Sequence, residues 1–296
     1  MVRMTLELAL HLAAVGEQRA YQVGLPFNLA VVDECGDLVA FHRMDNALLA
    51  GIDIASNKAW TSVTMQMPTA ELAKLAQPGG DAYGVNTTQQ GRVVILGGGI
   101  PLAGGSQIIG GIGVSGGTSA QDLLVAHAMV QTYNGIASRA ISAAHLAQAH
   151  SAYYRKHELD KMTLALAKLL LAASVRKSIQ LGLRCDIAIV DDGGNLVAFY
   201  RMDHARSGDI EVSENKAWSS VALQRPTADI AQMALPGGDA YGINTTNKGR
   251  LVVLGGGIPL RSRHRVIGGI GVSGGTSAQD VEVAEAAVHA FHAFNQ

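Results

Sequence analysis

The sequence contains few cysteines and few charged residues, and both shortages exclude classes of protein. Its 296 residues include only two cysteines, and 16% of the residues are charged. Two cysteines without CxxC spacing argue against a disulfide framework or a zinc site and fit a reducing compartment. The net charge of −1, without any block of basic residues, argues against a nucleic-acid partner.

Long apolar runs are absent as well, which argues against a membrane partner. No run is long enough to span a bilayer, and the first residues mix charge and polarity into what would be the apolar part of a signal peptide. We therefore expect a cytoplasmic protein. With 48% hydrophobic residues, the chain has enough apolar side chains for sizeable cores and enough length for two domains.

One glycine-rich stretch is written twice. LGGGIPL at 96–102 and IGGIGVSGGTSAQD at 109–122 return at 254–260 and 267–280, displaced by 158 residues. The register extends from Met4 and Met162 to the C-terminus, with about half of the aligned residues identical. Copies of this length are domains rather than solenoid repeats. We predict domains at 1–135 and 162–296, joined by an alanine-rich helical connector at 136–161.

The two copies share one order of predicted elements. In the first copy these are a helix at 6–23 that Gly24 ends, strands at 28–32 and 38–41, a helix around Asn57-Lys58-Ala59-Trp60, a short helix after Pro68, a strand turning at GGGIP into a second strand at 108–114, and a helix capped by Thr118 or Ser119. Neighbouring strands joined by short turns favour an antiparallel sheet. The sequence therefore predicts an α+β fold in each copy, with helices flanking an antiparallel sheet.

Ionisable residues present in both copies are the candidates for catalysis: Lys58, Lys216, Arg43, Arg201, Asp45 and Asp203. A partly desolvated lysine beside tryptophan can pair with a substrate carboxylate or act as a base; the alternative is a surface lysine lying over the ring. The Arg-x-Asp spacing can present a guanidinium to a carboxylate and a carboxylate to a proton. Its alternative is a salt bridge that holds the loop.

Glycines and neutral polar residues supply the candidates for ligand binding: Gly97, Gly98, Gly99, Gly255, Gly256, Gly257, Tyr83, Tyr241, Trp60, Trp218, Ser115 and Ser273. Three successive glycines can form an anion-binding nest of backbone N–H groups, or simply a hairpin turn. The SGGTSAQD segment is a second candidate anion site at a helix N-terminus, or a helix cap in which Asp122 complements the dipole.

None of the ten histidines has a histidine at the equivalent position of the other copy. A site present in both copies therefore contains no imidazole, which argues against a symmetric metal or haem site. We predict no metal site and no certain cofactor. Haem bound through Tyr, Met or Lys, or through a single asymmetric histidine, stays open.

The VVDxxGxLVAFxRMD segment, the NKAW helix, GGGIP and GxGVSGGTSAQD together resemble the GlcG/HbpS-like family, which includes haem-binding or haem-degrading domains and the C-terminal domain of PduO-type proteins. The resemblance covers both copies. It implies a profilin-like antiparallel sheet with flanking helices, in proteins that form homo-oligomers. It also implies a link to haem or corrinoid handling.

The residues themselves favour a pocket for an anionic organic ligand, such as a small or aromatic carboxylic acid or haem through its propionates. If the protein is an enzyme, the class expected from lysine and arginine is a cofactor-free lyase, isomerase or tautomerase. The alternatives are a non-catalytic haem- or corrinoid-binding module, which the resemblance favours, and a structural role in assembly.

Overall fold

The computed structural model describes residues 3–137 and 161–295, and the chain divides into two compact units around this gap. The predicted helical connector at 136–161 lies outside the described residues, apart from positions 136, 137 and 161 at its ends.

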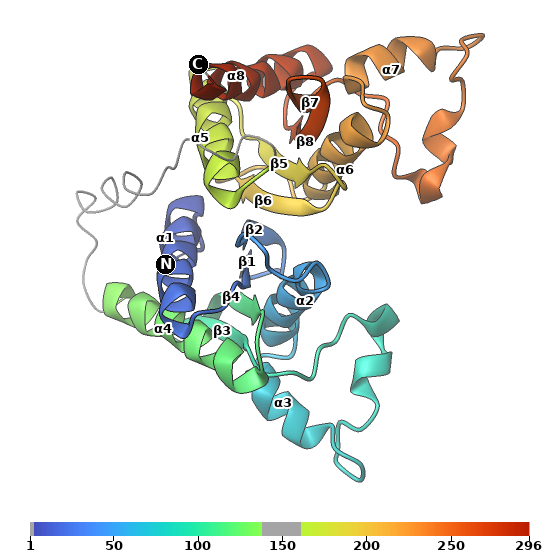
Figure 1. Ribbon diagram of the computed structural model, residues 1–296. Helices are drawn as coiled ribbons and strands as arrows, with labels where there is room; N and C mark the ends of the chain where they lie inside the picture. The colour runs from blue at the N-terminus through green and yellow to red at the C-terminus, as the bar shows by residue number, and fades with distance from the viewer. Residues whose placement is uncertain (1–2, 138–160, 296) are drawn as a thin grey trace. The chain divides into compact units, whose positions relative to one another are not determined.

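The first unit is an α+β fold whose elements follow the predicted order (Figure 1). They are α1 (Leu6–Val23), β1 (Asn28–Asp33), β2 (Leu38–Arg43), α2 (Gly51–Thr64), α3 (Thr69–Leu75), two short 3₁₀ turns (Val85–Thr87 and Gln89–Gly91), β3 (Gly99–Gly104), β4 (Gln107–Ser115) and α4 (Ser119–Ala137). Its four strands pair in the order β3-β4-β1-β2, and every pair is antiparallel.

The second unit repeats this arrangement. Its elements are α5 (Leu164–Gln180), β5 (Asp186–Asp191), β6 (Leu196–Arg201), α6 (Asp209–Ala222), α7 (Thr227–Met233), two 3₁₀ turns (Ile243–Thr245 and Asn247–Gly249), β7 (Gly257–Ser262), β8 (Arg265–Ser273) and α8 (Ser277–Asn295). The strands pair antiparallel in the order β7-β8-β5-β6. The predicted fold class is confirmed in both copies.

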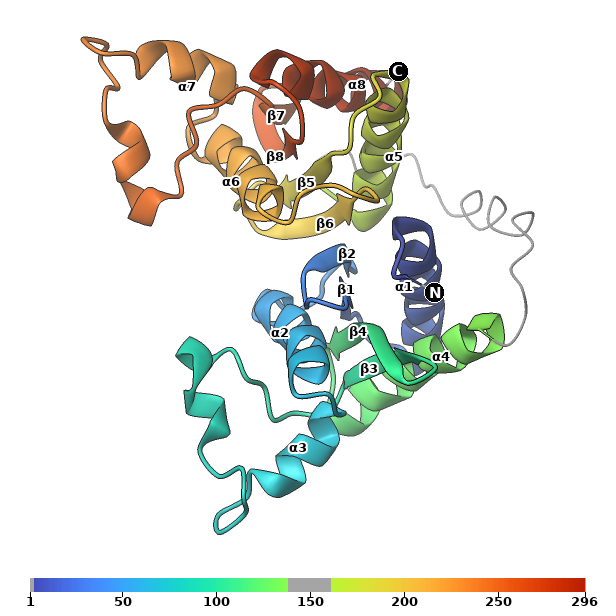
Figure 2. The ribbon, with the colours of Figure 1, turned by 180° about the vertical axis from the view of Figure 1, so that it is seen from behind.

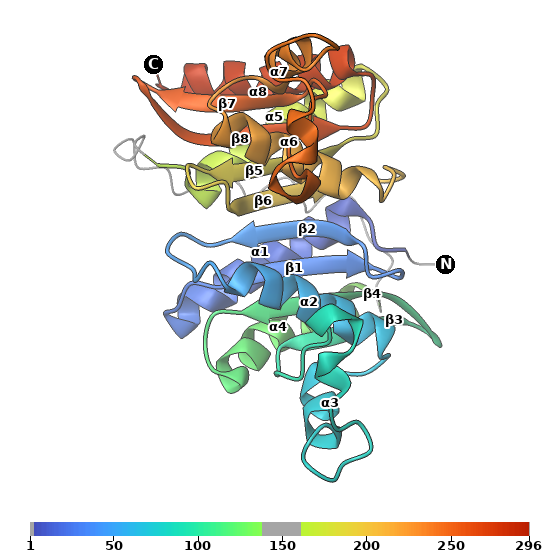
Figure 3. The same ribbon diagram turned by 90° about the vertical axis from the view of Figure 1, so that its right-hand side faces the viewer.

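Each sheet is covered on both faces. In the first unit α2 packs on one face, and α1 and α4 pack together on the other (Figure 3). In the second unit α6 takes the place of α2, and α5 and α8 take the places of α1 and α4. The central strands β1 and β5 are buried along almost their whole length, as expected for a sheet that lies between two helical layers.

Local signals position the first helix. Thr5 caps α1 by accepting a hydrogen bond from the Leu8 backbone N–H, and Gly24 ends the helix with a left-handed φ of 78°. These are the preferred residue types at the two ends of a helix. The predicted bounds of 6–23 are therefore confirmed.

The prediction that GGGIP is a hairpin turn was wrong. β3 begins at Gly99, inside this segment, and its hairpin turn to β4 lies at 104–107, where Gly105 has a φ of 73°. Residues 93–95 before the segment form no strand. A Cβ built on Gly99 would lie 2.4 Å from the backbone oxygen of Lys58 in α2, so the glycine allows the helix to contact the sheet directly. Gly113 in β4 has the same role, since its Cβ would lie 2.0 Å from the Ala55 carbonyl oxygen.

Beyond α3 and α7 the chain runs away from the sheet of its own unit before it returns to the glycine-rich segment (Figures 1 and 2). Tyr83 and Tyr241 lie in these extensions and are 68% and 69% exposed.

Candidate functional site

The residue on which the predicted chemistry depends most, Lys58, lies in the interior of the first unit. It is carried by α2 and is only 1% exposed. Its Nζ donates to the Val114 backbone oxygen at 2.9 Å and to Asp122 Oδ2 at 2.5 Å. Burial lowers the pKa of Lys58, and the hydrogen bond and the charge of Asp122 act in the opposite direction. The ammonium thus joins α2 to the end of β4 and to the first turn of α4.

Asp122 also holds the start of α4. Its Oδ1 accepts hydrogen bonds from the backbone N–H groups of Gly116 and Gly117, at 3.1 and 2.9 Å. The anion site predicted at SGGTSAQD is therefore filled by the chain's own carboxylate, placed where the helix dipole favours a negative charge. Ser115, the other candidate here, is the last residue of β4 and is buried.

The second unit repeats the arrangement. Lys216, 2% exposed, donates to the Val272 carbonyl oxygen at 2.8 Å and to Asp280 Oδ2 at 2.7 Å. Asp280 Oδ1 accepts from the backbone N–H of Gly275 at 2.8 Å. We call these two groups, Lys58–Val114–Asp122 and Lys216–Val272–Asp280, the lysine networks.

The predicted glycines lie beside the lysine networks. Gly98 has a φ of 117°, and a Cβ there would lie 3.1 Å from Lys58 Nζ and 2.6 Å from the Val114 carbonyl oxygen. The next backbone N–H, that of Gly99, donates to Thr69 Oγ1 at 2.9 Å. In the second unit the Gly257 N–H donates to Thr227 Oγ1 at the same distance. The triple glycine thus brings backbone, helix and ammonium close together within each unit.

The predicted tryptophans, which are half-buried, form a separate group on α2 and α6, next to Gly36 and Gly194 in the turns that follow β1 and β5. Arg92 lies over the Trp60 ring at 4.3 Å, and its Nε donates to Asn57 Oδ1 at 3.3 Å. Arg250 lies over Trp218 at 4.4 Å and donates to Asn215 at 3.2 Å. These are cation–π contacts, and the asparagine side chain holds the guanidinium over the ring through a hydrogen bond.

The remaining candidates are spread over other parts of the units. Arg43 and Arg201 end strands β2 and β6 and are half-buried, and Asp45 and Asp203 are exposed in the loops that follow. Tyr83 and Tyr241 lie in the exposed extensions. The structure therefore brings Lys58 together with Gly98 and Gly99, and the catalytic roles of Lys58, Arg43 and Asp45 and of their counterparts stay predictions.

Sequence reasoning missed the residues that complete the networks. Asp122 and Asp280 were recognised only as helix-capping residues, and Thr69 and Thr227 were not considered. The available signal was their presence in both copies together with the lysines and glycines that they contact.

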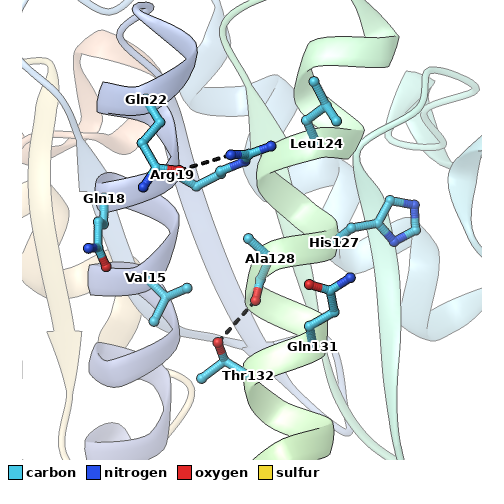
Figure 4. A pocket seen from close by; sticks show the side chains of 9 residues that line it. All are labelled: Val15, Gln18, Arg19, Gln22, Leu124, His127, Ala128, Gln131 and Thr132. Atoms are coloured by element: carbon cyan, nitrogen blue, oxygen red, sulfur yellow. Dashed lines mark hydrogen bonds between the residues drawn. The ribbon is translucent and has the colours of Figure 1, made fainter.

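Each unit has a hollow on its surface. In the first unit a groove of about 630 Å³ runs between α1 and α4, lined by Val15, Gln18, Arg19, Gln22, Leu124, His127, Ala128, Gln131 and Thr132. Arg19 reaches from α1 toward α4, and its Nη1 donates to Gln22 Oε1 at 2.8 Å. The His127 ring projects from the side of α4 that faces away from α1 (Figure 4). In the second unit a pocket of about 320 Å³ lies between α7, β7 and α8 and includes Gly257, Asp229 and Glu285.

Within residues 3–137 and 161–295, no group of three or more His, Cys, Asp or Glu side chains is arranged to hold a metal ion. Over the same part of the chain, the helices are too short or too polar to cross a membrane.

Comparison with known proteins places both units in one family. The family described as haem degrading protein HbpS-like matches residues 4–131 and again residues 162–289. The resemblance stated from the motifs is thereby confirmed.

Individual relatives match one copy each. A 15.0 kDa protein from the dhaT-dhaS intergenic region of Citrobacter freundii is 37% identical over 137 residues, which are 46% of this chain and 96% of the relative. The corrinoid adenosyltransferase PduO of Salmonella typhimurium is 38% identical over 136 residues, which are 46% of this chain but only 38% of that enzyme. A solved PduOC:heme complex, 32% identical, matches with a TM-score of 0.43 and covers 44% of this chain and 94% of its own. The chain belongs to the HbpS-like family, of which it contains two tandem copies.

Proposed function

We propose that this chain is a tetrapyrrole-binding module, for haem or a corrinoid, and that its first unit takes the ligand in the groove between α1 and α4. Membership of a family described as haem degrading supports the ligand class, and so does the partial match to a corrinoid adenosyltransferase. The observation that carries the proposal is the groove itself, which combines an imidazole and a guanidinium with apolar side chains.

The donor set of this groove fits haem. His127 offers an imidazole, which is the usual axial ligand of haem iron in globins and peroxidases. Arg19 offers a guanidinium group, whose parallel N–H donors suit a propionate carboxylate. Val15, Leu124 and Ala128 give apolar contact for a macrocycle, and the volume of about 630 Å³ lies in the usual range of ligand sites. His127 is exposed, so its ring can change rotamer freely on binding. Bound haem would supply the iron; the chain would supply the axial nitrogen and the countercharge.

The second unit has a different surface at the same place. Glu285 stands at the position of His127, and Glu282 at the position of Leu124. Glu282 Oε1 lies 2.5 Å from Lys177 Nζ, the counterpart of Arg19, so an ion pair joins α5 to α8 there. Acidic side chains thus replace the imidazole of His127 and the apolar side chain of Leu124, and they suit neither a haem iron nor its propionates; the imidazole on this face of α8, that of His289, stands at the position of Gln131 instead. We therefore expect one tetrapyrrole per chain.

Haem is an organic anion through its propionates, as the sequence favoured, but its binding in this groove does not depend on the predicted lysines. Because Asp122 and Asp280 already bind the ammonium groups, a substrate carboxylate would have to displace a buried aspartate. The lyase or isomerase chemistry therefore stays a prediction without support from a specific contact.

Titration of the full chain with haemin, followed by the Soret band, tests the proposal. We expect a shifted Soret band with one equivalent of haemin bound per chain. His127→Ala should lower the affinity for haemin strongly, and Arg19→Gln should lower it less. His289→Ala is the matched control, because His289 occupies the equivalent face of α8 and should leave binding unchanged. Hydroxocobalamin in the same assay separates corrinoid from haem.

Unchanged haemin affinity in His127→Ala, or two equivalents bound per chain, would overturn the proposed site. Failure of both haemin and hydroxocobalamin to bind the wild-type chain would overturn the ligand class.

A further inference from the structure

The two copies differ at one fully buried polar position at the start of the central strand. In the first unit this position is Asn28, the first residue of β1. Its side-chain amide donates to the Leu48 backbone oxygen at 3.0 Å and to the Ser115 backbone oxygen at 3.4 Å. Asn28 thereby ties the turn before α2 to the ends of β1 and β4.

In the second unit the equivalent residue is Asp186. The strand pairing and the turn around it are the same, but Asp209 replaces Gly51, where a Cβ would lie 2.2 Å from the Asn28 amide nitrogen. Asp186 pairs with Arg201 and Ser273 across the sheet, as Asn28 pairs with Arg43 and Ser115. The Asp209 N–H donates to the Arg206 carbonyl oxygen at 3.0 Å, as the Gly51 N–H does to that of Leu48. The two carbonyl oxygens that Asn28 satisfies are therefore present again, at Arg206 and Ser273.

Asp186 is 0% exposed, and neither of its side-chain oxygens has a hydrogen-bond donor as a partner. An ionised carboxylate accepts hydrogen bonds and cannot donate, so it would face the two carbonyl oxygens with only repulsion. A protonated carboxyl has one O–H and can donate to either of them, as the asparagine amide does. A buried charge without a donor is also strongly disfavoured, whereas the neutral acid is not.

From this geometry we propose that Asp186 holds a proton in the folded second unit, and that loss of this proton loosens the turn at 202–208 and the first turn of α6. The proton stands in for the side-chain N–H that the first unit obtains from asparagine. The ligand of this site is a proton, and the first copy, which has Asn28 at this position, cannot bind it in this way.

The groups around Asp186 act in both directions. From β6, Arg201 lowers its pKa, and so does Arg206 from the turn; from α6, Asp209 and Glu214 raise it. Burial is the largest cause, and together these raise the pKa of Asp186 to about 8. From β8, the Ser273 hydroxyl donates to Asp209 Oδ1 at 3.0 Å, and Arg206 Nε lies 2.7 Å from Asp209 Oδ2. The neighbouring Cys185 is buried, and its own raised pKa keeps its thiol neutral.

The second copy has one more acidic residue next to Asp186, and this residue has no counterpart in the first copy. Asp209 stands where the first unit has Gly51, and its carboxylate is already bound by Ser273 and Arg206. Ionisation of Asp186 would place a second negative charge next to it. Because the unfolded chain loses the proton near pH 4 and the folded unit near pH 8, the stability of this unit falls as pH rises between the two.

The test uses the full chain and two opposite substitutions. Asp186→Asn removes the acid from the second unit, and it is made alone and together with Asp209→Gly, which gives the amide the space that it has in the first unit. Asn28→Asp is the matched control that gives the first unit the acid. Thermal unfolding between pH 5 and 9 is measured together with amide hydrogen exchange of residues 202–213. A difference infrared spectrum of wild type minus Asp186→Asn then detects the C=O band of a protonated carboxyl at pH 6.

We expect the wild type to lose melting temperature and exchange protection at 202–213 as pH rises toward 8, and Asp186→Asn to remain flat and melt higher at pH 8. Asn28→Asp should transfer the same pH dependence to residues 44–55. The proposal is overturned if Asp186→Asn keeps the wild-type pH profile or if the carboxyl band is missing. It is also overturned if Ca²⁺ or Mg²⁺ at pH 7 stabilises the wild type but not Asp186→Asn, because the oxygens would then hold a metal ion rather than a proton.

Discussion

Replacing Lys58 by Met removes the ammonium from the interior of the first unit while keeping a flexible side chain of similar length. The substitution leaves Asp122 buried and deprives it of its counter-ion, and it leaves the Val114 carbonyl without the Nζ donor. Asp122 keeps its two backbone donors, Gly116 and Gly117. The carboxylate is thus still hydrogen-bonded, but its charge is no longer compensated.

The expected cost follows from these contacts. Breaking a buried ion pair by removing one partner typically costs about 3–5 kcal/mol, because the other charge stays behind in the interior. The two remaining N–H donors place Lys58→Met at the lower end, about 3 kcal/mol. Asp122→Asn should cost more, because it leaves the buried ammonium with only the Val114 carbonyl oxygen as its partner. If the new Oδ1 keeps the Gly116 and Gly117 N–H groups, the amide also turns N–H donors toward the ammonium.

The assay is urea unfolding of the full chain at pH 7, with Lys58→Met, Asp122→Asn and the double variant compared in a thermodynamic cycle. The loss in free energy of unfolding should be smaller for the double variant than the sum of the losses for the two single variants, because the double variant contains neither the buried ammonium nor the buried carboxylate. Lys216→Met in the second unit is the internal repeat of the experiment and should destabilise its own unit by a similar amount. Single variants that cost less than about 1 kcal/mol, or that add without coupling, would refute the structural role of the networks.

Three further substitutions test contacts at other places, the second as a control for the first. Gly99→Ala should destabilise the first unit by about 1–3 kcal/mol, because its Cβ would lie 2.4 Å from the Lys58 carbonyl oxygen. Gly135→Ala, where a Cβ meets nothing within 4 Å in the last turns of α4, should be neutral or stabilising by up to about 1 kcal/mol; equal effects of the two in thermal unfolding would contradict this. Arg92→Ala removes the cation over Trp60 and should cost about 0.5–1 kcal/mol while changing the intrinsic fluorescence of that ring; an unchanged spectrum would argue against the stacking.

Much of the fold could be predicted from the sequence because the signals are local. Thr5 and Gly24 define the ends of α1 through contacts within a few residues, and the copy displaced by 158 residues revealed two domains with one element order. The GGGIP segment was misread because consecutive glycines look alike whether they serve a turn or a close contact. Only the position of α2, whose Lys58 carbonyl oxygen lies against Gly99, distinguishes the two.

The site was less predictable because its partners lie far apart in the chain. Lys58 and Asp122 are 64 residues apart, so no spacing pattern marks them as a pair. The groove was missed because Arg19 and His127 come from helices at opposite ends of the first copy, and because a search for residues repeated in both copies passes over an asymmetric histidine.

The sequence by itself determined the repeat, the family, the class of fold, both ends of α1 and the start of α4, since these depend on composition and on neighbours along the chain. The tertiary structure decided what the polar residues do. Folding placed the predicted lysines inside the units with aspartates, and it left both side-chain oxygens of Asp186 buried without a hydrogen-bond partner at the position where the first unit has Asn28. Protonation and charge pairing depend on burial and on partners across the sheet, which are properties of the folded chain.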